Sequence, residues 1–192
     1  MNTAVIAEPQ VTKPTQWQID PAHSAARFSV RHLMISNVRG EFTKMSGSAF
    51  IDPADRTKST VEVTIEAASV NTSEPQRDEH LRSADFFDVA NHPKISFHSK
   101  RVAALGAENF KLTGDLTIRG VTKEVTFDVE GPTASVKDPW GNIRAGVTAS
   151  AKINRKDFGL VWNALTEAGG VVVGDEIKIT IEAELIQQAP AV

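Results

Sequence analysis

The strongest constraint on the fold is an alternation of apolar and polar residues that recurs along most of the chain. Between Val61 and Ala67 every second residue is apolar, and the residues between them are Glu or Thr. The same period recurs in segments 24–33, 110–119, 143–153 and 177–185. A period of two is typical of a half-buried β-strand. We therefore predict an all-β protein whose strands each have one apolar and one polar face.

The order of these segments favours one closed sheet. About eight or nine strands follow one another, separated by turn residues such as Asn37–Gly40, Asp52–Asp55 and Gly120. We predict an up-and-down antiparallel β-barrel of about eight strands, because closure removes the unpaired strand edges that a flat sheet would expose. An immunoglobulin-like sandwich is the alternative architecture for the same pattern.

The apolar faces are predicted to point into the barrel. Barrels of the outer membrane also alternate, but with the apolar face toward lipid. This chain has no tyrosine for an aromatic girdle, and the polar faces of its strands are rich in Thr, Lys and Glu. Residues 1–15 lack the basic region and apolar core of a signal peptide. We therefore expect a cytoplasmic protein, with flexible tails over 1–16 and 187–192 and a single barrel domain over 17–186.

Length, charge and composition exclude several classes of protein. The 192 residues suffice for one sizeable core. The net charge is −3 and acids and bases are mixed along the chain, which is unlike the basic stripe of a nucleic-acid-binding protein. The chain contains no cysteine, so it has neither disulfides nor thiolate metal sites. No segment is suited to cross a membrane as a helix.

One segment, His80–Asp88, lacks the alternation of apolar and polar residues that predicts strands elsewhere. Ser73 and Gln76 stand at the spacing of a capping box around Pro75, which predicts a short surface helix. The adjacent rings of Phe86 and Phe87 follow, flanked by two aspartates. We expect the rings to turn into an apolar space while the carboxylates stay in water, as a lid over one end of the barrel. A second helical turn is predicted at Phe158–Leu165.

The sequence leaves open whether the barrel interior is hollow. Several residues predicted to face inward are small, which hints at a cavity. These are Ala67, Ser99, Gly114, Ala145, Ala149, Ala151 and Ala183. The alternative is that phenylalanine side chains fill the same space, and an eight-stranded barrel is wide enough for either arrangement.

Four ordered motifs resemble the YceI-like family of polyisoprenoid-binding, lipocalin-like barrel proteins, and the resemblance extends from about Trp17 to Leu185. The motifs are Trp17–Ser24 running into Phe28–His32, His80–Asp88 with Pro93 and Phe97 after it, Gly114–Thr122, and Ile153–Gly159 leading to Trp162.

The resemblance implies a lipocalin-like barrel whose apolar pore holds an isoprenoid chain, such as a polyprenyl phosphate or the tail of a quinone. It implies a carrier or storage protein with no cofactor beyond the bound lipid, and homodimers occur among similar proteins. Many similar proteins carry a signal peptide and are periplasmic. This chain differs from them, because no signal peptide is recognised in its sequence.

On this basis we predict which residues bind the ligand. Ten apolar residues are expected to line or close the pore: Phe28, Val30, Phe42, Leu81, Phe86, Phe87, Phe97, Leu160, Trp162 and Leu165. His80 and Arg82 in the lid and Arg155 at a strand end are candidates for contact with a polar head group. The competing interpretation is that His80 and Arg82 belong to a solvated helix face and that Arg155 fixes a turn.

Two other functions remain as alternatives. A metal- or His-dependent hydrolase would use His23, His32 and His80, and a ligand-free barrel would serve as a scaffold. No histidine pair has the helical spacing of a metal site with a nearby Glu. Asp20, His23 and Ser24 lie too close in sequence to predict a triad, which is defined by geometry. We therefore predict no catalytic and no metal site, and expect His23 to stabilise its turn by hydrogen bonding.

Overall fold

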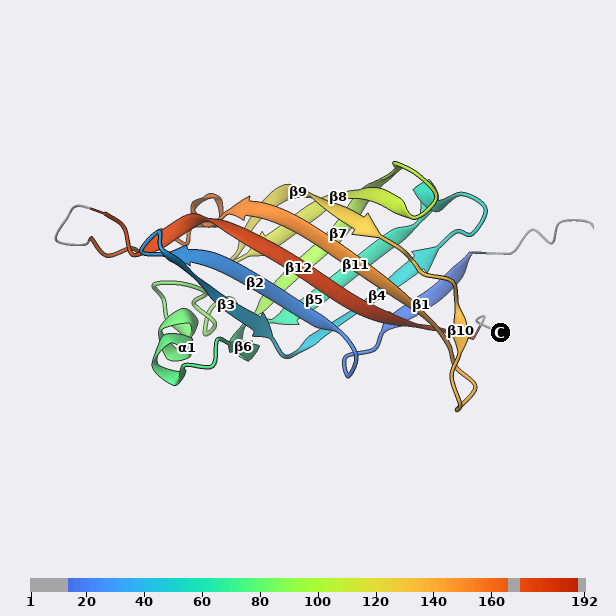
Figure 1. Cartoon of the computed structure of the whole chain (residues 1–192), viewed down its shortest axis with the longest axis horizontal. Coiled ribbons are helices and arrows are strands. Elements are labelled where there is room, and N and C mark those ends of the chain that lie inside the picture. The colour runs from blue at the N-terminus through green and yellow to red at the C-terminus, as the bar shows by residue number, and fades with distance from the viewer. Residues whose placement is uncertain (1–13, 166–169, 190–192) are drawn as a thin grey trace, which may run out of the picture.

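The computed structural model describes residues 14–165 and 170–189, which form a closed eight-stranded antiparallel barrel (Figure 1). The strands are β1 (Thr15–Ile19), β2 (Ala25–His32), β3 (Ser36–Phe42), β4 (Met45–Ile51), β5 (Thr60–Glu66), β6 (Val70–Asn71), β7 (Lys94–Ala104), β8 (Asn109–Ile118), β9 (Val121–Glu130), β10 (Val136–Lys137), β11 (Ile143–Asn154) and β12 (Val173–Gln187). The α-helix is α1 (Pro75–Arg82), and short 3-10 helices are η1 (Arg56–Lys58), η2 (Ala67–Ser69) and η3 (Arg155–Phe158).

Six of the shorter strands combine into three long, bent strands of the barrel. β1 pairs with β4 and β2 pairs with β3, so β1–β2 and β3–β4 run side by side as two continuous strands. β4 pairs with β5 and β3 with β6, which makes β5–β6 the third long strand. β12 closes the barrel, because it pairs with β1 and β2 on one side and with β11 on the other. The predicted up-and-down barrel is confirmed.

The pairing between neighbouring strands is uneven around the barrel. β11 and β12 are paired from Asn154↔Glu176 to Arg144↔Ile186. β9 and β11, in contrast, are paired only at Glu130↔Thr148, Val129↔Ala149 and Asp128↔Ser150. The contact between β9 and β11 is therefore a weakly hydrogen-bonded seam in the barrel wall.

The apolar faces of the strands point inward, as predicted. The larger core cluster includes Phe97 and Phe127, whose ring centroids lie 5.2 Å apart in an edge-to-face arrangement. A second cluster, with Trp17 and Leu185, lies where β1 meets β12. The described helices are too short or too polar for any of them to cross a membrane.

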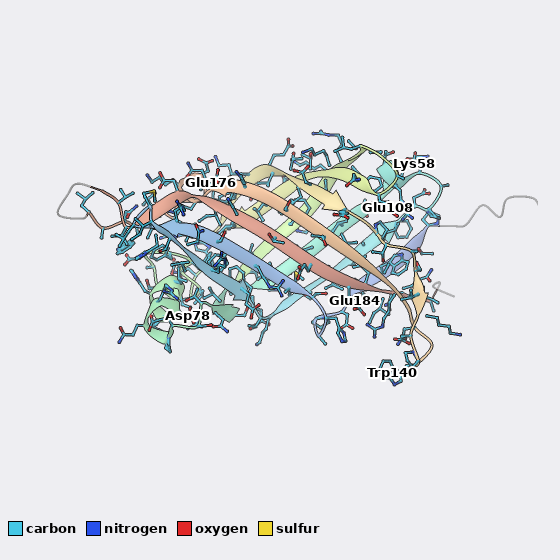
Figure 2. The ribbon with its side chains drawn as sticks, in the orientation of Figure 1. Lys58, Asp78, Glu108, Trp140, Glu176 and Glu184 are labelled. Carbon is cyan, nitrogen blue, oxygen red and sulfur yellow. The ribbon has the colours of Figure 1, made fainter. Side chains whose placement is uncertain are left out.

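The connections gather at two ends. One end carries α1, η3 and the β2–β3 and β8–β9 turns, and we call it the lid end. The opposite end carries η1, β10 and the β7–β8 turn, and we call it the far end. Figure 2 shows Asp78 at the lid end, and Lys58 and Glu108 at the far end. The β8–β9 hairpin turns at Arg119 and Gly120, both with positive φ, as a two-residue turn of this hand requires.

Two glycines, Gly40 and Gly47, lie inside paired strands. The predicted turn at Asn37–Gly40 is wrong, because these residues belong to β3 and the chain turns at Leu33–Ile35. A Cβ atom on Gly40 would lie 2.5 Å from the ring of Phe28, so this glycine makes room for the ring. Gly47 likewise allows close approach, since its Cβ would lie 2.3 Å from the carbonyl oxygen of Glu62.

The lid helix exists, but its cap differs from the prediction. Glu74, not Ser73, is the N-cap, and its carboxylate accepts hydrogen bonds from the backbone N–H groups of Gln76 and Arg77. Pro75 stands at the start of the helix as predicted. Because the Glu74 side chain reaches the free N–H groups itself, the reciprocal bonds of a capping box are not needed.

The second predicted helix, Phe158–Leu165, is wrong. Phe158 ends η3, Gly159 caps it in the left-handed conformation, and residues 160–164 are not helical. The guanidinium of Arg155 binds the carbonyl oxygens of Leu160 and Trp162, which holds the segment extended. The barrel strands also begin at Thr15 and end at Gln187, slightly beyond the predicted domain limits, and residues 1–13 of the predicted N-terminal tail lie outside the described residues.

Candidate ligand-binding site

The barrel encloses an elongated cavity with a volume of about 290 Å³. Its lining is almost wholly apolar and includes residues from both ends of the barrel. Leu81 and Phe86 line it at the lid end, and Arg56, Ser59 and Pro132 at the far end. The open question of a hollow or filled interior is therefore answered in favour of a cavity that runs along the barrel.

Small side chains help to leave this space open. Ala149 and Ala183, two of the residues predicted to face inward, line the cavity directly. Ala67 and Ala145 are buried in the wall instead, at 1% and 3% exposure. Phenylalanines such as Phe28, Phe97 and Phe110 line the cavity and leave it open.

Most residues predicted to contact the ligand lie on the cavity wall. They are Phe28, Val30, Phe42, Leu81, Phe86, Phe87, Phe97 and Leu160. They come from β2, β3, β7, α1 and the segments after α1 and η3, so the tertiary fold has brought them to one surface. Their role in binding stays a prediction, while their position is established.

Two residues of the predicted set do not line the cavity. The Trp162 ring packs against the outer side of Phe86, with centroids 5.3 Å apart. Leu165 is 79% exposed and forms an isolated bridge with Val171. The reason is the extended course of this segment, because a helix over 158–165 would have turned Leu165 back toward the barrel.

The two lid phenylalanines occupy different environments. Phe87 faces the cavity and meets the edge of Phe42, with ring centroids 5.5 Å apart. Phe86 lies between the cavity and a pair of rings outside it, since His80 stands edge-on to both Phe86 at 5.0 Å and Trp162 at 4.7 Å. Phe86 is therefore packed against two further rings, His80 and Trp162, whereas Phe87 contacts the ring of Phe42.

The lid helix is attached to the barrel mainly by polar contacts. Asp78 is buried, and its carboxylate accepts hydrogen bonds from the backbone N–H and the hydroxyl of Thr72 at 2.8 and 2.6 Å. Arg77 donates to the Thr72 hydroxyl and carbonyl. Arg82 donates to the carbonyl oxygens of Ala68 and Val70 at 2.9 and 2.8 Å. These bonds fix α1 over the β5–β6 strand.

The three candidates for contact with a head group all form hydrogen bonds or ion pairs with other groups of the protein. Arg82 binds backbone carbonyls as described, and His80 is within 2.9 Å of the Asp85 carboxylate on the surface. Arg155 is 3% exposed and donates to the carbonyl oxygens of Gly174, Leu160 and Trp162. Burial lowers the pKa of Arg155, and the nearby Asp175 carboxylate opposes that shift.

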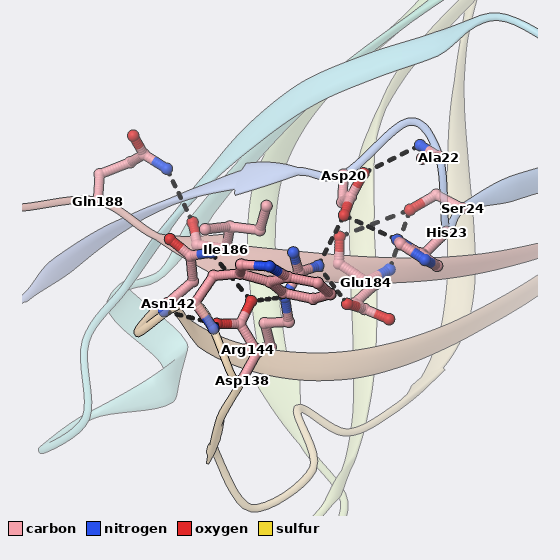
Figure 3. A network of polar contacts seen from close by, with 11 residues as sticks. Asp20, Ala22, His23, Ser24, Asp138, Asn142, Arg144, Glu184, Ile186 and Gln188 are labelled. Atoms are coloured by element: carbon pink, nitrogen blue, oxygen red, sulfur yellow. Dashed lines mark hydrogen bonds and ion pairs between the residues drawn. The ribbon is translucent and has the colours of Figure 1, made fainter.

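The main polar cluster of the far end has no counterpart among the residues predicted from the sequence (Figure 3). Its centre is Arg144 on β11, which donates to Asp138 and to Asp20 at 2.6 Å each, and also to Glu184. The hydrogen bond from Arg144 is the largest cause that lowers the pKa of Asp20 to about 2. Burial raises the pKa of Asp138, but hydrogen bonds from Arg144 and Asn142 outweigh it and the pKa falls.

His23 has the structural role that the sequence indicated. Its Nδ1 atom is 2.9 Å from the Asp20 carboxylate, which also accepts from the backbone N–H of Ala22, so both contacts stabilise the bend between β1 and β2. Asp20, His23 and Glu184 present ligand atoms close enough for a metal ion. However, the Arg144 guanidinium already binds both carboxylates, and its positive charge opposes a metal cation there.

The residues of the hydrolase alternative do not form a site. His23 lies in the far-end bend, whereas His32 ends β2 and His80 lies on α1 at the lid end. The structure therefore places no shared substrate position among them, since a nucleophile and its base must be within hydrogen-bonding reach.

Comparison with known proteins agrees with this architecture. A family model described as the YceI-like domain matches residues 17–185. The chain belongs to the YceI-like family. A UPF0312 protein from Staphylococcus aureus strain N315 is 39% identical to it over 170 residues, which cover 88% of this chain and 96% of the relative. The predicted family is thereby confirmed.

Several solved structures have the same fold. A YceI protein from Campylobacter jejuni is 35% identical, with a TM-score of 0.70 over 83% of this chain and 90% of the other. BcnA from Burkholderia cenocepacia is 23% identical, with a TM-score of 0.74 over 86% and 98%. A polyisoprenoid-binding domain from Saccharophagus degradans is 17% identical, with a TM-score of 0.65 over 90% and 98%.

Proposed function

We propose that this YceI-like barrel binds an isoprenoid lipid, a polyprenyl phosphate or a quinone tail, in its interior for carriage, storage or sequestration. The observation that carries the proposal is the continuous apolar cavity between the two ends of the barrel. The description of the Saccharophagus degradans domain as polyisoprenoid-binding supports the same ligand class.

The energetics of the cavity suit a long hydrocarbon chain. Each buried CH₂ group contributes about 0.8 kcal/mol, so several isoprene units bind tightly without polar contacts. Selectivity then comes from the length of the cavity and from the few polar groups at its ends. A hollow barrel also argues against the scaffold alternative, for which a filled interior is the more stable arrangement.

The first test is to look for the lipid in the purified protein. Native mass spectrometry of the intact protein, followed by organic extraction and lipid analysis, is expected to reveal an isoprenoid at up to one molecule per chain. Protein that carries no lipid, and that takes up none when mixed with a prenol, would contradict the proposal.

A pair of lid variants tests where the binding energy lies. Phe87→Asp places a carboxylate beside the apolar cavity and is expected to lower lipid retention strongly, because a charge there must be desolvated. Phe87→Leu is the matched control and should retain lipid. Arg82→Ala removes bonds to the carbonyls of Ala68 and Val70 and should lower retention far less. Equal losses in Phe87→Asp and Arg82→Ala would show that a head contact at the lid dominates.

The proposal includes the remaining expectations from the sequence. We propose a binding protein with no catalytic activity and no cofactor beyond the lipid, located in the cytoplasm and capable of forming a homodimer. Measurement of the metal content tests the hydrolase alternative, for which stoichiometric zinc or copper is expected. Cell fractionation and light scattering test the compartment and the oligomeric state.

A further inference from the structure

We propose that the head group of the ligand is a phosphate or diphosphate ester and that it binds at the far end, against Arg56, with the isoprenoid tail directed toward the lid. The inference rests on the proposed function and specifies the ligand and its orientation. It reverses the expectation from the sequence that the head group lies at the lid.

Arg56 combines a positive charge with a place on the cavity wall. It begins η1 in the β4–β5 connection, is half-buried, and lines the cavity together with Ser59. Within residues 14–165 and 170–189, no group accepts a hydrogen bond from its side chain or forms an ion pair with it. An uncompensated guanidinium therefore stands at the end of an apolar cavity.

The two aspartates of the β4–β5 connection, Asp52 and Asp55, form hydrogen bonds with groups other than Arg56. The Asp52 carboxylate accepts hydrogen bonds from the backbone N–H groups of Ala54 and Asp55, each at 2.9 Å. Asp55 accepts from the N–H and the hydroxyl of Thr57, which lower its pKa, and pairs with Lys58 at 3.5 Å. These bonds hold the loop in one shape and keep both carboxylates away from Arg56.

Ser59 supplies a second donor beside Arg56. Its hydroxyl oxygen accepts a hydrogen bond from the backbone N–H of Asp52 at 3.1 Å, which fixes the side chain. Its hydroxyl proton has no acceptor among the residues that the structure describes. An anion at this end of the cavity would thus meet a charged donor and a neutral one from the same short segment.

Four arginines on or around the lid differ in this respect. Each binds a backbone carbonyl oxygen of the protein: Arg77 that of Thr72, Arg82 those of Ala68 and Val70, Arg119 those of Gly159 and Ala84, and Arg155 those of Leu160, Trp162 and Gly174. A head group bound by any of these four would have to displace such bonds, whereas a head group at Arg56 displaces none.

The chemistry of the site selects an anion. A guanidinium next to apolar surface loses hydration when a ligand fills the cavity, and only a negative partner restores that energy. The planar fork of arginine matches the oxygen geometry of a phosphate, and such charge-assisted pairs are among the stronger hydrogen bonds. A neutral quinone or alcohol head would leave the charge of Arg56 uncompensated.

The test compares two ligands with the same tail. Lipid-stripped protein is titrated with geranylgeranyl phosphate and with geranylgeraniol, and both dissociation constants are measured by calorimetry. The wild type is expected to bind the phosphate about 10-fold to 100-fold more tightly. Arg56→Gln should abolish this preference by weakening the binding of the phosphate, and it should not weaken the binding of the alcohol. Lys58→Gln, whose side chain is 71% exposed in the same helix, should keep the preference and serves as the control.

The outcomes separate the two proposals. If neither ligand binds the wild type, the proposed function fails and this inference fails with it. If both bind the wild type equally, or if the preference survives in Arg56→Gln, the lipid-binding function stands and the assignment of Arg56 is overturned. Urea unfolding of Arg56→Gln establishes that the variant is folded, and the affinity for the alcohol provides the same control in the calorimeter.

Discussion

One arginine at each end of the barrel binds several acceptors at once, and the acceptors differ in kind. At the lid end, Arg155 is buried and donates to backbone carbonyl oxygens. At the far end, Arg144 has a side chain that is 15% exposed and donates to carboxylates of Asp20, Asp138 and Glu184. Arg155 therefore binds mainly neutral acceptors that do not titrate, whereas Arg144 binds carboxylates that do.

This difference explains what each end can do. The carbonyl bonds of Arg155 fix the chain after η3 in place beside the aromatic lid. The carboxylate network of Arg144 joins the β1–β2 bend to the start of β11 and to the loop before it. Acid should loosen the second arrangement while leaving the first intact, and the following predictions test that contrast.

The largest effect is expected from Arg155→Met. The change removes the Arg155 donor from the carbonyl oxygens of Gly174, Leu160 and Trp162, and it should lower the free energy of unfolding by about 3–5 kcal/mol, since each buried acceptor left unpaired costs about 1–3 kcal/mol. Urea unfolding measures the loss. Arg119→Met, a half-buried arginine that also donates to carbonyls, should cost only about 1 kcal/mol. Equal losses in the two variants would mean that burial of Arg155 is not what matters.

Arg144→Met should have the next largest effect. It removes the shared donor of three carboxylates and is expected to lower the free energy of unfolding by about 2 kcal/mol at neutral pH. Lys111→Met is the comparison, because its pair with Asp128 lies on the surface and should contribute less than about 0.5 kcal/mol. If Lys111→Met proved as costly as Arg144→Met, the far-end network would have no special role.

Acidification should distinguish the two arginine variants. The pKa of Asp20 is lowered from 3.8 to about 2 in the folded protein, so its stabilising contribution is fully present above about pH 4 and is lost as the pH falls toward 2. The difference in unfolding free energy between wild type and Arg144→Met should therefore shrink over that range. The difference for Arg155→Met should stay nearly constant, since its main acceptors are carbonyls. Urea titrations at a series of pH values measure both, and parallel curves would refute the contrast.

The smallest effect is expected from Leu165→Ser. Leu165 is 79% exposed, so the change should alter the free energy of unfolding by less than about 0.5 kcal/mol and leave lipid retention unchanged. Leu160→Ser in the same segment is the matched control, because Leu160 is buried and lines the cavity. Loss of retention in Leu165→Ser would restore the predicted role of this residue at the mouth.

The strands and the inner surface of the cavity could be predicted from the sequence. A period of two assigns each side chain to one face of a strand, and closure of the sheet makes one face the interior, so residues such as Phe28, Phe42 and Phe97 were placed correctly. The prediction failed where the contacts of a particular side chain, and not the alternation of residues, set the backbone. Phe158–Leu165 is extended because Arg155 binds its carbonyls, and Gly40 allows Phe28 to pack rather than making a turn.

The polar ends of the barrel were decided by the tertiary structure alone. Arg144 and Asp20 are 124 residues apart in the sequence and meet only because the β1–β2 strand and β11 both pair with β12. Arg56 is one of many arginines in the sequence, and its side chain stands out only because the fold places it on the cavity wall without an acceptor among the described residues. Alternation along a strand is a local property of the chain, whereas the pairing of charges depends on which strands become neighbours when the barrel closes.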